Sequence, residues 1–236
     1  MVHPTAGADA VRLATYNIHG CVGSDARFDP HRVVNVLRAL DADVVALQEV
    51  ESTRFGGEDV LAFLADQTGC TAVAGPTMKR RDADYGNALL TRLPVQRVER
   101  VDLSVAGCEP RGLIDARLGD AAQPLRVFAT HLGLRAAERR TQAERLLARL
   151  ERAPLPRTAL LADVNEWWPW CNALRRLSRH FSVDHAPASF PARLPLLALD
   201  RILLRGHDGR PRGGCDRSRT ARQASDHLPV WVDARW

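Results

Sequence analysis

Short apolar runs separated by turn residues recur along most of the chain, and each has the length of a β-strand. Runs of four to eight apolar or alternating residues between turn residues favour strands. The predicted strands cover residues 11–18, 43–47, 71–75, 86–91, 95–103, 111–118, 124–131, 160–164, 197–204 and 228–232.

Apolar residues at helical spacing predict four helices between these strands. In the first, Asp29 is the expected N-cap and Pro30 the first helical residue. The second covers residues 58–68 and stops at Gly69, and the fourth lies around residues 170–179. The third covers residues 136–152, and we expect its arginines to form a solvated face: Arg139, Arg140, Arg145, Arg149 and Arg152.

Residues 205–224 are rich in Arg and Gly and lack a helical apolar pattern, so we expect a mobile or hairpin-like connection there. No internal repeat, low-complexity tract or linker divides the chain. We therefore predict one domain over residues 1–236, with a flexible N-terminus over residues 1–10. Helices interleaved with strands, then consecutive strands, then helices favour an α/β (α+β) fold with a two-layer sheet core.

The composition is that of a soluble globular protein, with 45% hydrophobic and 26% charged residues. The net charge of +5 permits anionic partners without demanding them. The five cysteines are widely spread and form no CxxC pair, which favours a reducing compartment over a disulfide framework or a zinc site. No signal peptide or membrane span is apparent, so we expect a cytoplasmic monomer.

Polar residues cluster where the predicted strands begin or end. Asp226 and His227 precede the apolar run 228–232. Neighbours on a strand point to opposite faces, so these two can serve one site only from a loop that leads into the strand. Equivalent positions on the other strands hold Asn17, Glu49, Asn87, His131, Asp163 and Asn165. Asp200 belongs with them, although it lies inside its predicted strand.

Together these residue types are those of phosphate-ester hydrolysis. Carboxylates and amides without cysteine form a hard ligand set that suits Mg²⁺, with Mn²⁺ as the alternative. His131 and His227 supply proton transfer, and Asp200 is available to orient one of them. Arg111, at the start of its strand, can hold an anionic oxygen. Each residue alone also has a structural explanation, such as a turn asparagine or a solvated carboxylate, so the combination carries the prediction.

Seven stretches of the chain resemble motifs of the endonuclease/exonuclease/phosphatase superfamily, the DNase I-like metal-dependent phosphohydrolases. They cover residues 15–20, 47–50, 85–90, 129–133, 162–165, 199–203 and 225–229. One departure is visible, because the usual Gly-Asp-Phe-Asn reads Ala162-Asp163-Val164-Asn165 here. The resemblance implies a four-layer α/β/β/α sandwich with two mixed sheets face to face and a cleft at one end.

The resemblance also implies roles for the polar residues. Glu49 would be the principal metal ligand, with Asn17 and Asp226 nearby. Asp163 and Asn165 would orient the attacking water and the phosphate. His131, and His227 paired with Asp200, would flank the phosphate, while Asn87 and Arg111 would contact it.

Three function classes stay open: a phosphodiesterase, a nuclease and a non-catalytic module. The compact length and modest charge leave little basis for gripping DNA, whose affinity depends on phosphate contacts. We therefore favour a phospholipid head group or a small phosphodiester over a DNase I-type substrate. Three tryptophans directly follow the Asp163 motif: Trp167, Trp168 and Trp170. They are interpreted as core, as a base-stacking rim or as a peripheral membrane contact aided by nearby arginines.

Overall fold

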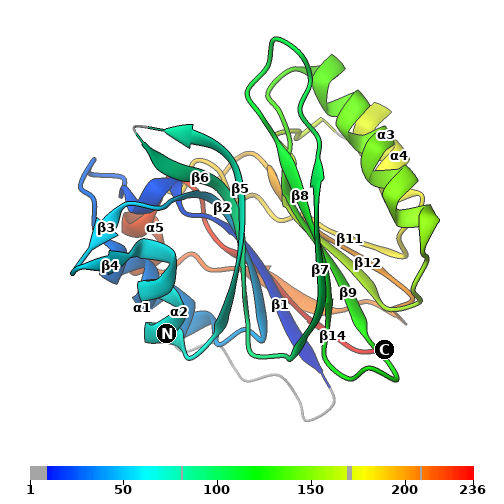
Figure 1. Cartoon of the computed structure of the whole chain (residues 1–236), viewed down its shortest axis with the longest axis horizontal. Coiled ribbons are helices and arrows are strands. Elements are labelled where there is room, and N and C mark those ends of the chain that lie inside the picture. The colour runs from blue at the N-terminus through cyan, green and yellow to red at the C-terminus, as the bar shows by residue number, and fades with distance from the viewer. Residues whose placement is uncertain (1–9, 81, 169–171, 208) are drawn as a thin grey trace.

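The protein is a sandwich of four layers, in which two β-sheets lie face to face and helices cover both outer faces (Figure 1). The computed structural model describes residues 10–80, 82–168, 172–207 and 209–236. The α/β/β/α architecture expected from the sequence is confirmed. The N-terminal residues 1–9, expected to be flexible, and Trp170 lie outside the described residues.

The first sheet joins strands from both ends of the chain, in the order β13-β14-β1-β2-β6-β5. Strand β1 runs parallel to β2, and every other pair in this sheet is antiparallel. The bounds are Arg212–Cys215 for β13, Val230–Ala234 for β14, Val11–Asn17 for β1, Val44–Glu51 for β2, Ala83–Thr91 for β6 and Thr71–Arg80 for β5.

The second sheet comes from one continuous part of the chain and has the order β11-β12-β10-β9-β8-β7. Strands β9 and β10 are parallel, and the other pairs are antiparallel. The bounds are Val183–His185 for β11, Asp200–Arg205 for β12, Thr158–Asp163 for β10, Leu125–His131 for β9, Gly112–Leu118 for β8 and Val95–Asp102 for β7. A small separate ribbon pairs β3 (Arg54–Phe55) with β4 (Glu58–Asp59).

Helices α1, α2 and α5 lie on the first sheet, and α3 and α4 lie on the second (Figure 1). Their bounds are Pro30–Leu40, Val60–Thr68, Arg219–Ala224, Ala136–Arg152 and Asn172–Ser178 respectively. The expected cap at Asp29 is present, since its side chain accepts a hydrogen bond from the His31 amide. No helix in the described ranges is long and apolar enough to cross a membrane.

Three apolar cores hold the four layers together, one at each interface between layers. Strand β1 shows how the alternation of side chains serves two of them. Leu13 packs between the sheets, whereas Ala14 and Tyr16 pack against the helices of the first sheet.

Two expectations from the sequence are wrong. Residues 205–224 include strand β13 and the six-residue helix α5, which escaped notice because an edge strand of Arg and Gly and a short helix carry little apolar pattern. The arginines of α3 do not all form a solvated face. Arg139 is buried, and Arg149 is largely covered by its ion pairs with Asp115 and Glu99.

The topology brings the ends of several neighbouring strands of the second sheet to the same end of that sheet. Asp163, at the end of β10, pairs with His131 at the end of β9. On its other side it pairs with Asp200, which opens β12 rather than lying inside it. In the facing sheet, Asn17 ends β1 beside Gln48 of β2. The predicted site residues therefore meet at one end of the sandwich.

Candidate active site

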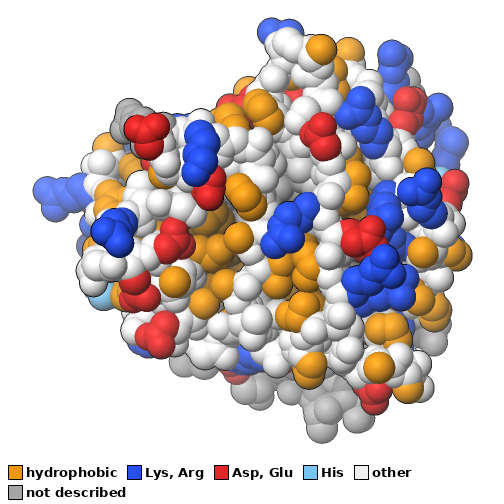
Figure 2. Space-filling model, viewed as in Figure 1, with side chains coloured by type: hydrophobic (Ala, Val, Ile, Leu, Met, Phe, Trp, Pro, Cys, Tyr) orange, Lys and Arg blue, Asp and Glu red, His pale blue; other side chains and the backbone are white. Residues whose placement is uncertain are grey.

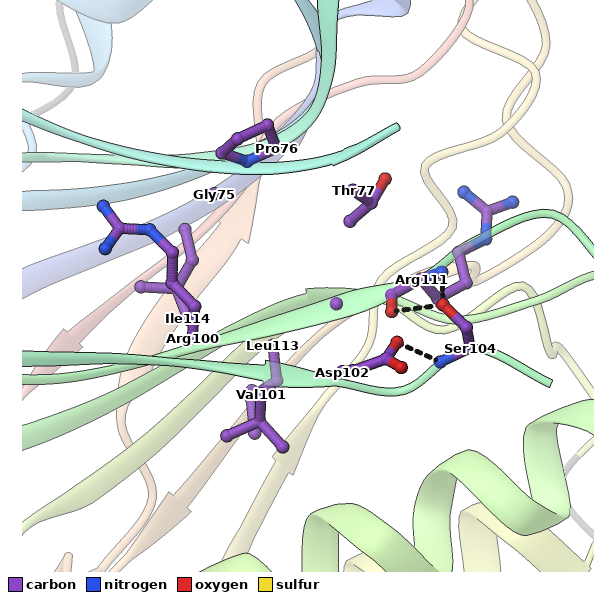
Figure 3. Close-up of a pocket in the computed structure, with 11 residues that line it drawn as sticks. Gly75, Pro76, Thr77, Arg100, Val101, Asp102, Ser104, Arg111, Leu113 and Ile114 are labelled. Atoms are coloured by element: carbon purple, nitrogen blue, oxygen red, sulfur yellow. Dashed lines mark hydrogen bonds between the residues drawn. The ribbon is translucent and has the colours of Figure 1, made fainter. Parts of the chain in front are cut away.

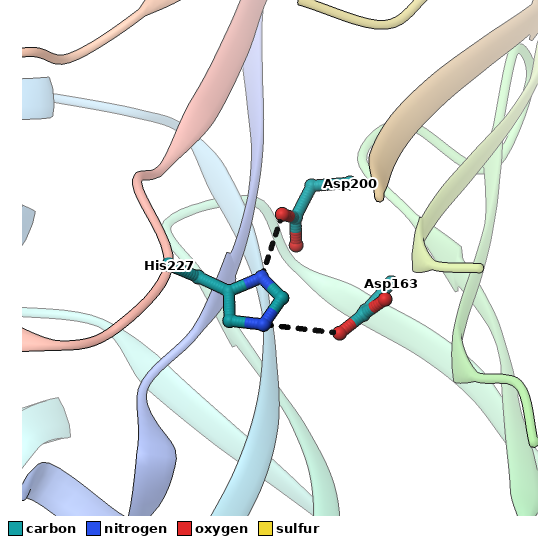
Figure 4. A group of neighbouring side chains, drawn as sticks. All are labelled: Asp163, Asp200 and His227. Atoms are coloured by element: carbon teal, nitrogen blue, oxygen red, sulfur yellow. Dashed lines mark hydrogen bonds and ion pairs between the residues drawn. The ribbon is translucent and has the colours of Figure 1, made fainter. Parts of the chain in front are cut away.

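His227 and Asp200 form a buried pair that joins the two sheets (Figure 4). Nδ1 of His227 lies 2.8 Å from Oδ2 of Asp200, and the same oxygen accepts a 2.5 Å hydrogen bond from the Ser189 hydroxyl. Burial alone would lower the pKa of His227, but the charge of Asp200 and the hydrogen bond to it raise that pKa to about 10. His227 is thus an imidazolium at neutral pH.

Asp163 occupies the centre of the site and is almost fully buried. Its Oδ1 accepts a hydrogen bond from the Asn165 backbone amide, and its Oδ2 accepts one from Asn17 Nδ2 at 3.1 Å. Burial raises the pKa of Asp163, against the neighbouring histidines, which lower it. Both ring Nε2 atoms face Oδ2, at 3.4 Å for His131 and 3.8 Å for His227.

His131 has the opposite charge preference. Burial lowers its pKa to about 4, Asp163 opposes that shift, and Arg111 adds to it. The ring is therefore neutral at neutral pH. Its Nδ1 lies 3.2 Å from Arg111 Nη1, and its Nε2 lies 2.8 Å from the side-chain amide of Asn165.

Glu49 lies on a β-bulge, where the register of β2 against β6 shifts between Leu47 and Val50. Its φ of 56° is in the left-handed region, which a glutamate rarely adopts. A bulge re-aims a side chain out of the alternation of the strand. At this bulge Glu49 Oε1 accepts a 3.0 Å hydrogen bond from Asn17 Nδ2. Asn17 therefore connects Glu49 to Asp163.

The other predicted residues lie around this centre. Asp226 is partly exposed beside His227, with its Oδ1 3.8 Å from His19 Nδ1. Asn87 is buried and donates to the Gly112 carbonyl at 3.0 Å. Arg111 also forms an ion pair with Glu109 at 3.0 Å, which helps to hold its guanidinium beside His131.

Two small cavities flank Arg111. One, of about 270 Å³, lies between β5 and the β7–β8 pair, and its lining includes Thr77 and Asp102 (Figure 3). The other, of about 200 Å³, lies on the side of Cys108 and Leu134. Groups bound at Arg111 would thus have space on both sides.

Several exposed apolar side chains lie in the loops next to β9, β10 and β12. Trp167 and Trp168 are 50% and 56% exposed, so the described part of the tryptophan cluster is not core. Leu134 follows β9, and Leu194 and Leu196 precede β12; all three are more exposed than the tryptophans. Because β9, β10 and β12 are neighbours in the sheet, these loops lie at the same end of it, next to His131, Asp163 and Asp200.

Ser189 and Glu109 were missed by the sequence analysis. Ser189 lies 11 residues before Asp200 in a loop without an apolar pattern. Nothing in the sequence indicates that its hydroxyl donates a hydrogen bond to Asp200, and only the folded structure shows this contact. Glu109 lies in the loop before Arg111, where its glutamate resembles any surface carboxylate.

The donor set fits a hard divalent cation. Glu49, Asn17 and Asp226 offer carboxylate and amide oxygens, and Glu49 and Asp226 are partly exposed, so a cation could reach them. A second group, Asp163, Asp200 and His227, has possible ligand atoms within 4.8 Å of one another. That group is buried, and its Nδ1 and Oδ2 atoms are already engaged with each other, which favours the Glu49 side.

Comparisons with known proteins agree with this geometry. Residues 14–227 match the model of the Endonuclease/Exonuclease/phosphatase family. The chain is 31% identical over 242 residues to the uncharacterized protein YbhP of Escherichia coli strain K12, covering 93% of this chain and 94% of that protein.

Solved structures share the fold. An endonuclease/exonuclease/phosphatase from Beutenbergia cavernae has a TM-score of 0.75 at 23% identity, covering 96% of this chain and 72% of that chain. The human Nocturnin catalytic domain with bound sulfate has a TM-score of 0.72 at 17% identity, covering 96% and 93%. A mannosyl-6-phosphatase of Bacteroides thetaiotaomicron has a TM-score of 0.71 at 16% identity, covering 96% and 100%. The chain therefore belongs to the endonuclease/exonuclease/phosphatase family of phosphoesterase hydrolases, which generally depend on divalent metal ions.

Proposed function

We propose that this chain is a metal-dependent phosphodiesterase that acts on a phospholipid head group or another small phosphodiester. One observation carries the proposal: two histidines face the same oxygen of Asp163, and burial lowers the pKa of His131 whereas Asp200 raises the pKa of His227. Environments that push two pKa values apart separate the roles of the two groups in acid–base chemistry. Phosphoryl transfer needs both charge stabilisation and an oriented water.

The residues of the site then take the following roles in hydrolysis. Asp163, held by Asn17 and Asn165, orients the attacking water. His227, kept protonated by Asp200, donates to a phosphoryl oxygen. His131 and Arg111 donate to the same group from the other side. Asn87 donates a hydrogen bond to the carbonyl of Gly112, the residue after Arg111, and so supports the position of Arg111.

Mg²⁺, with Mn²⁺ as the alternative, would be held by Glu49 with Asn17 and Asp226. Such a cation neutralises phosphate charge and polarises the phosphorus–oxygen bond. In the structure, the side-chain nitrogen of Asn17 donates a hydrogen bond to Glu49, and its side-chain oxygen accepts one from the His19 amide. That oxygen has a second lone pair, which is left to bind a metal.

The substrate preference is supported by the apolar rim, a set of exposed side chains around the site: Leu134, Trp167, Trp168, Leu194 and Leu196. They are five of the seven exposed large hydrophobic residues in the described ranges. Arg135 and Arg193, both exposed, stand next to Leu134 and Leu194. Apolar tips beside arginines suit peripheral contact with an anionic bilayer.

A nuclease is the second candidate, because exposed tryptophans also stack on bases. A nuclease that grips duplex DNA needs a track of cations along the phosphate backbone. On the face seen in Figure 2, basic and acidic side chains are interspersed and form no single basic track.

A substrate panel tests the proposal. Bis(p-nitrophenyl) phosphate, phospholipid in mixed micelles, p-nitrophenyl phosphate and supercoiled plasmid are compared with Mg²⁺ and with excess chelator. We expect Mg²⁺-dependent turnover of the soluble diester and of a phospholipid. Plasmid nicking without turnover of any phospholipid would favour the nuclease, and preferential release from the monoester would contradict a phosphodiesterase.

A further inference from the structure

We infer that Arg139 and Glu166 are positioning residues of this site, which together fix the two loops that carry His131 and Asn165. The inference rests on the proposed function, because it takes His131 and Asn165 as catalytic. The sequence pattern singles out neither residue, and it places Arg139 on a solvated helix face.

Arg139 reaches from α3 to both loops at once. Its Nη1 donates to the carbonyls of Gly133 and Leu134, at 3.2 and 2.6 Å. Its Nη2 donates to Glu166 Oε2 at 2.5 Å. On its other oxygen, Glu166 accepts a hydrogen bond from the Trp168 amide at 3.0 Å. One guanidinium thus joins the loop after β9 to the loop after β10.

The helix approaches the first of these loops unusually closely. The Gly133 amide donates to Gln142 Oε1 at 2.8 Å, and Gln142 in turn donates to Glu138. A Cβ at Gly133 would lie 1.8 Å from Glu138 Cδ, so a larger residue would displace the Glu138 side chain. Glu138, Arg139 and Gln142 are all buried, and the N-terminal half of α3 therefore presents a polar face to the site.

This polar face acts next to the catalytic groups. Gly133 is two residues after His131, and Glu166 directly follows Asn165. Asn165 has a left-handed backbone, with a φ of 50°. Its side chain donates to the Leu132 carbonyl at 2.9 Å, so the two loops are joined near the reacting atoms as well.

A buried ion pair is poor evidence for stabilisation, because desolvation offsets much of its attraction. Its fixed geometry is the more informative property here. A misplacement of about 1 Å in a catalytic group can cost about 100-fold in rate. The loss of this pair should therefore reduce turnover more than it reduces binding.

The same helix and strand carry a matched control at their far end. Arg126, at the start of β9, pairs with Asp115 at 2.7 Å and, like Arg139, is buried. It donates to the carbonyls of Leu150 and Ala153 near the end of α3, at 3.2 and 2.5 Å. Arg126 thus repeats the chemistry of Arg139 away from the site.

The experiment compares Arg139→Gln, Glu166→Gln, the double variant and Arg126→Gln. Turnover of bis(p-nitrophenyl) phosphate is measured at saturating Mg²⁺, well below each melting temperature. We expect kcat to fall roughly 10- to 100-fold in the first two, with KM changed by less than about threefold. The double variant should lose about as much as either single one, because the two residues act as a unit. Arg126→Gln should lower the melting temperature and keep its kcat.

A second measurement is independent of turnover. The imidazole resonances of His131, assigned by their loss in His131→Gln, should move in Glu166→Gln and stay in place in Arg126→Gln. Glu166→Gln is nearly isosteric, which keeps the test usable if Arg139→Gln does not fold. An unchanged kcat and unchanged His131 resonances in Glu166→Gln would overturn the inference, as would an equal kcat loss in Arg126→Gln. Inactive wild-type protein would refute the proposed function alone, and the resonances would still decide the positioning role.

Discussion

Arg111 donates a hydrogen bond to Nδ1 of His131 across 3.2 Å, and this contact selects the tautomer of the ring. An arginine can only donate, so Nδ1 accepts and the proton of the neutral ring sits on Nε2. That proton points toward Oδ2 of Asp163, which lies 3.4 Å from Nε2. Arg111 thus aims the donor of His131 into the site.

Replacing Arg111 should raise the pKa of His131. Arg111→Gln removes a nearby positive charge, which now lowers that pKa. The value should stay below the 6.5 of an ordinary imidazole, because burial is the larger cause of the shift and persists. An NMR titration of the His131 resonances checks this. A pKa that falls or does not change would contradict the contact.

Glu49→Ala should abolish nearly all Mg²⁺-dependent turnover while the fold persists. A carboxylate on a partly exposed bulge contributes little to the core, whereas alanine offers no ligand oxygen. Turnover against Mg²⁺ concentration and circular dichroism are measured together. Glu58→Ala, which removes an exposed carboxylate from the β3–β4 ribbon, is the control. Wild-type activity in a folded Glu49 variant would refute the metal role.

Asp200 and His227 should behave as one unit. Asp200→Asn removes the charge that keeps His227 protonated, and His227→Ala removes the ring itself. We expect each to cost about 100-fold or more in kcat, with little further loss in the double variant. Ser189→Ala should cost less, because Asp200 keeps its bond to the ring. Additive losses would show that Asp200 and His227 act separately.

The apolar rim should increase the rate on phospholipid micelles and have little effect on the rate of the chemical step. Trp167→Ala combined with Trp168→Ala should lower the rate on phospholipid micelles and change the rate on bis(p-nitrophenyl) phosphate much less. The ratio of the two rates is measured at fixed salt, since ions screen any contribution of the arginines. Val95→Ala, at an exposed apolar residue at the start of β7, is the control. Equal loss on both substrates would argue against a membrane contact.

Asp115 should make the fold sensitive to acid. Burial alone would raise the pKa of Asp115, but hydrogen bonds from Arg126 and Arg149 lower it overall. Its contribution to stability is then complete above the unfolded value of about 3.9 and is lost as pH falls through the lower folded value. Urea unfolding from pH 7 to pH 3 should show a steeper loss below about pH 4 in wild type than in Asp115→Asn. Parallel curves would contradict this account.

The order of helices and strands along the chain predicted a two-layer sheet core, and the family resemblance implied the four layers that the structure has. Leu13 and Tyr16 on β1 already indicate two buried faces, and a strand buried on both sides implies helices beyond the sheet. The strand ends that carry His131 and Asp163 followed from the sequence, whereas Asp200 was expected inside its strand; the structure brings the three residues together.

What could not be predicted depends on contacts between distant segments. The bulge at Glu49 is a property of how β2 pairs with β6, and a strand ending at residue 47 was the simpler expectation. The bond from Ser189 to Asp200 crosses a loop that has no periodic pattern. Arg139 shares its helix with solvated arginines, and only the approach of two loops distinguishes it from them.

Asn17 Nδ2 contacts Glu49 of one sheet and Asp163 of the other, so the candidate site lies between the two sheets. The second sheet is one uninterrupted stretch of chain, while the first needs β14 to pair with β1, more than 200 positions earlier. Pairings that distant in sequence form slowly, since a long loop must close first. During refolding, secondary structure should therefore return before catalysis. The recovery of enzymatic activity during refolding would then report when β14 pairs with β1 and completes the first sheet.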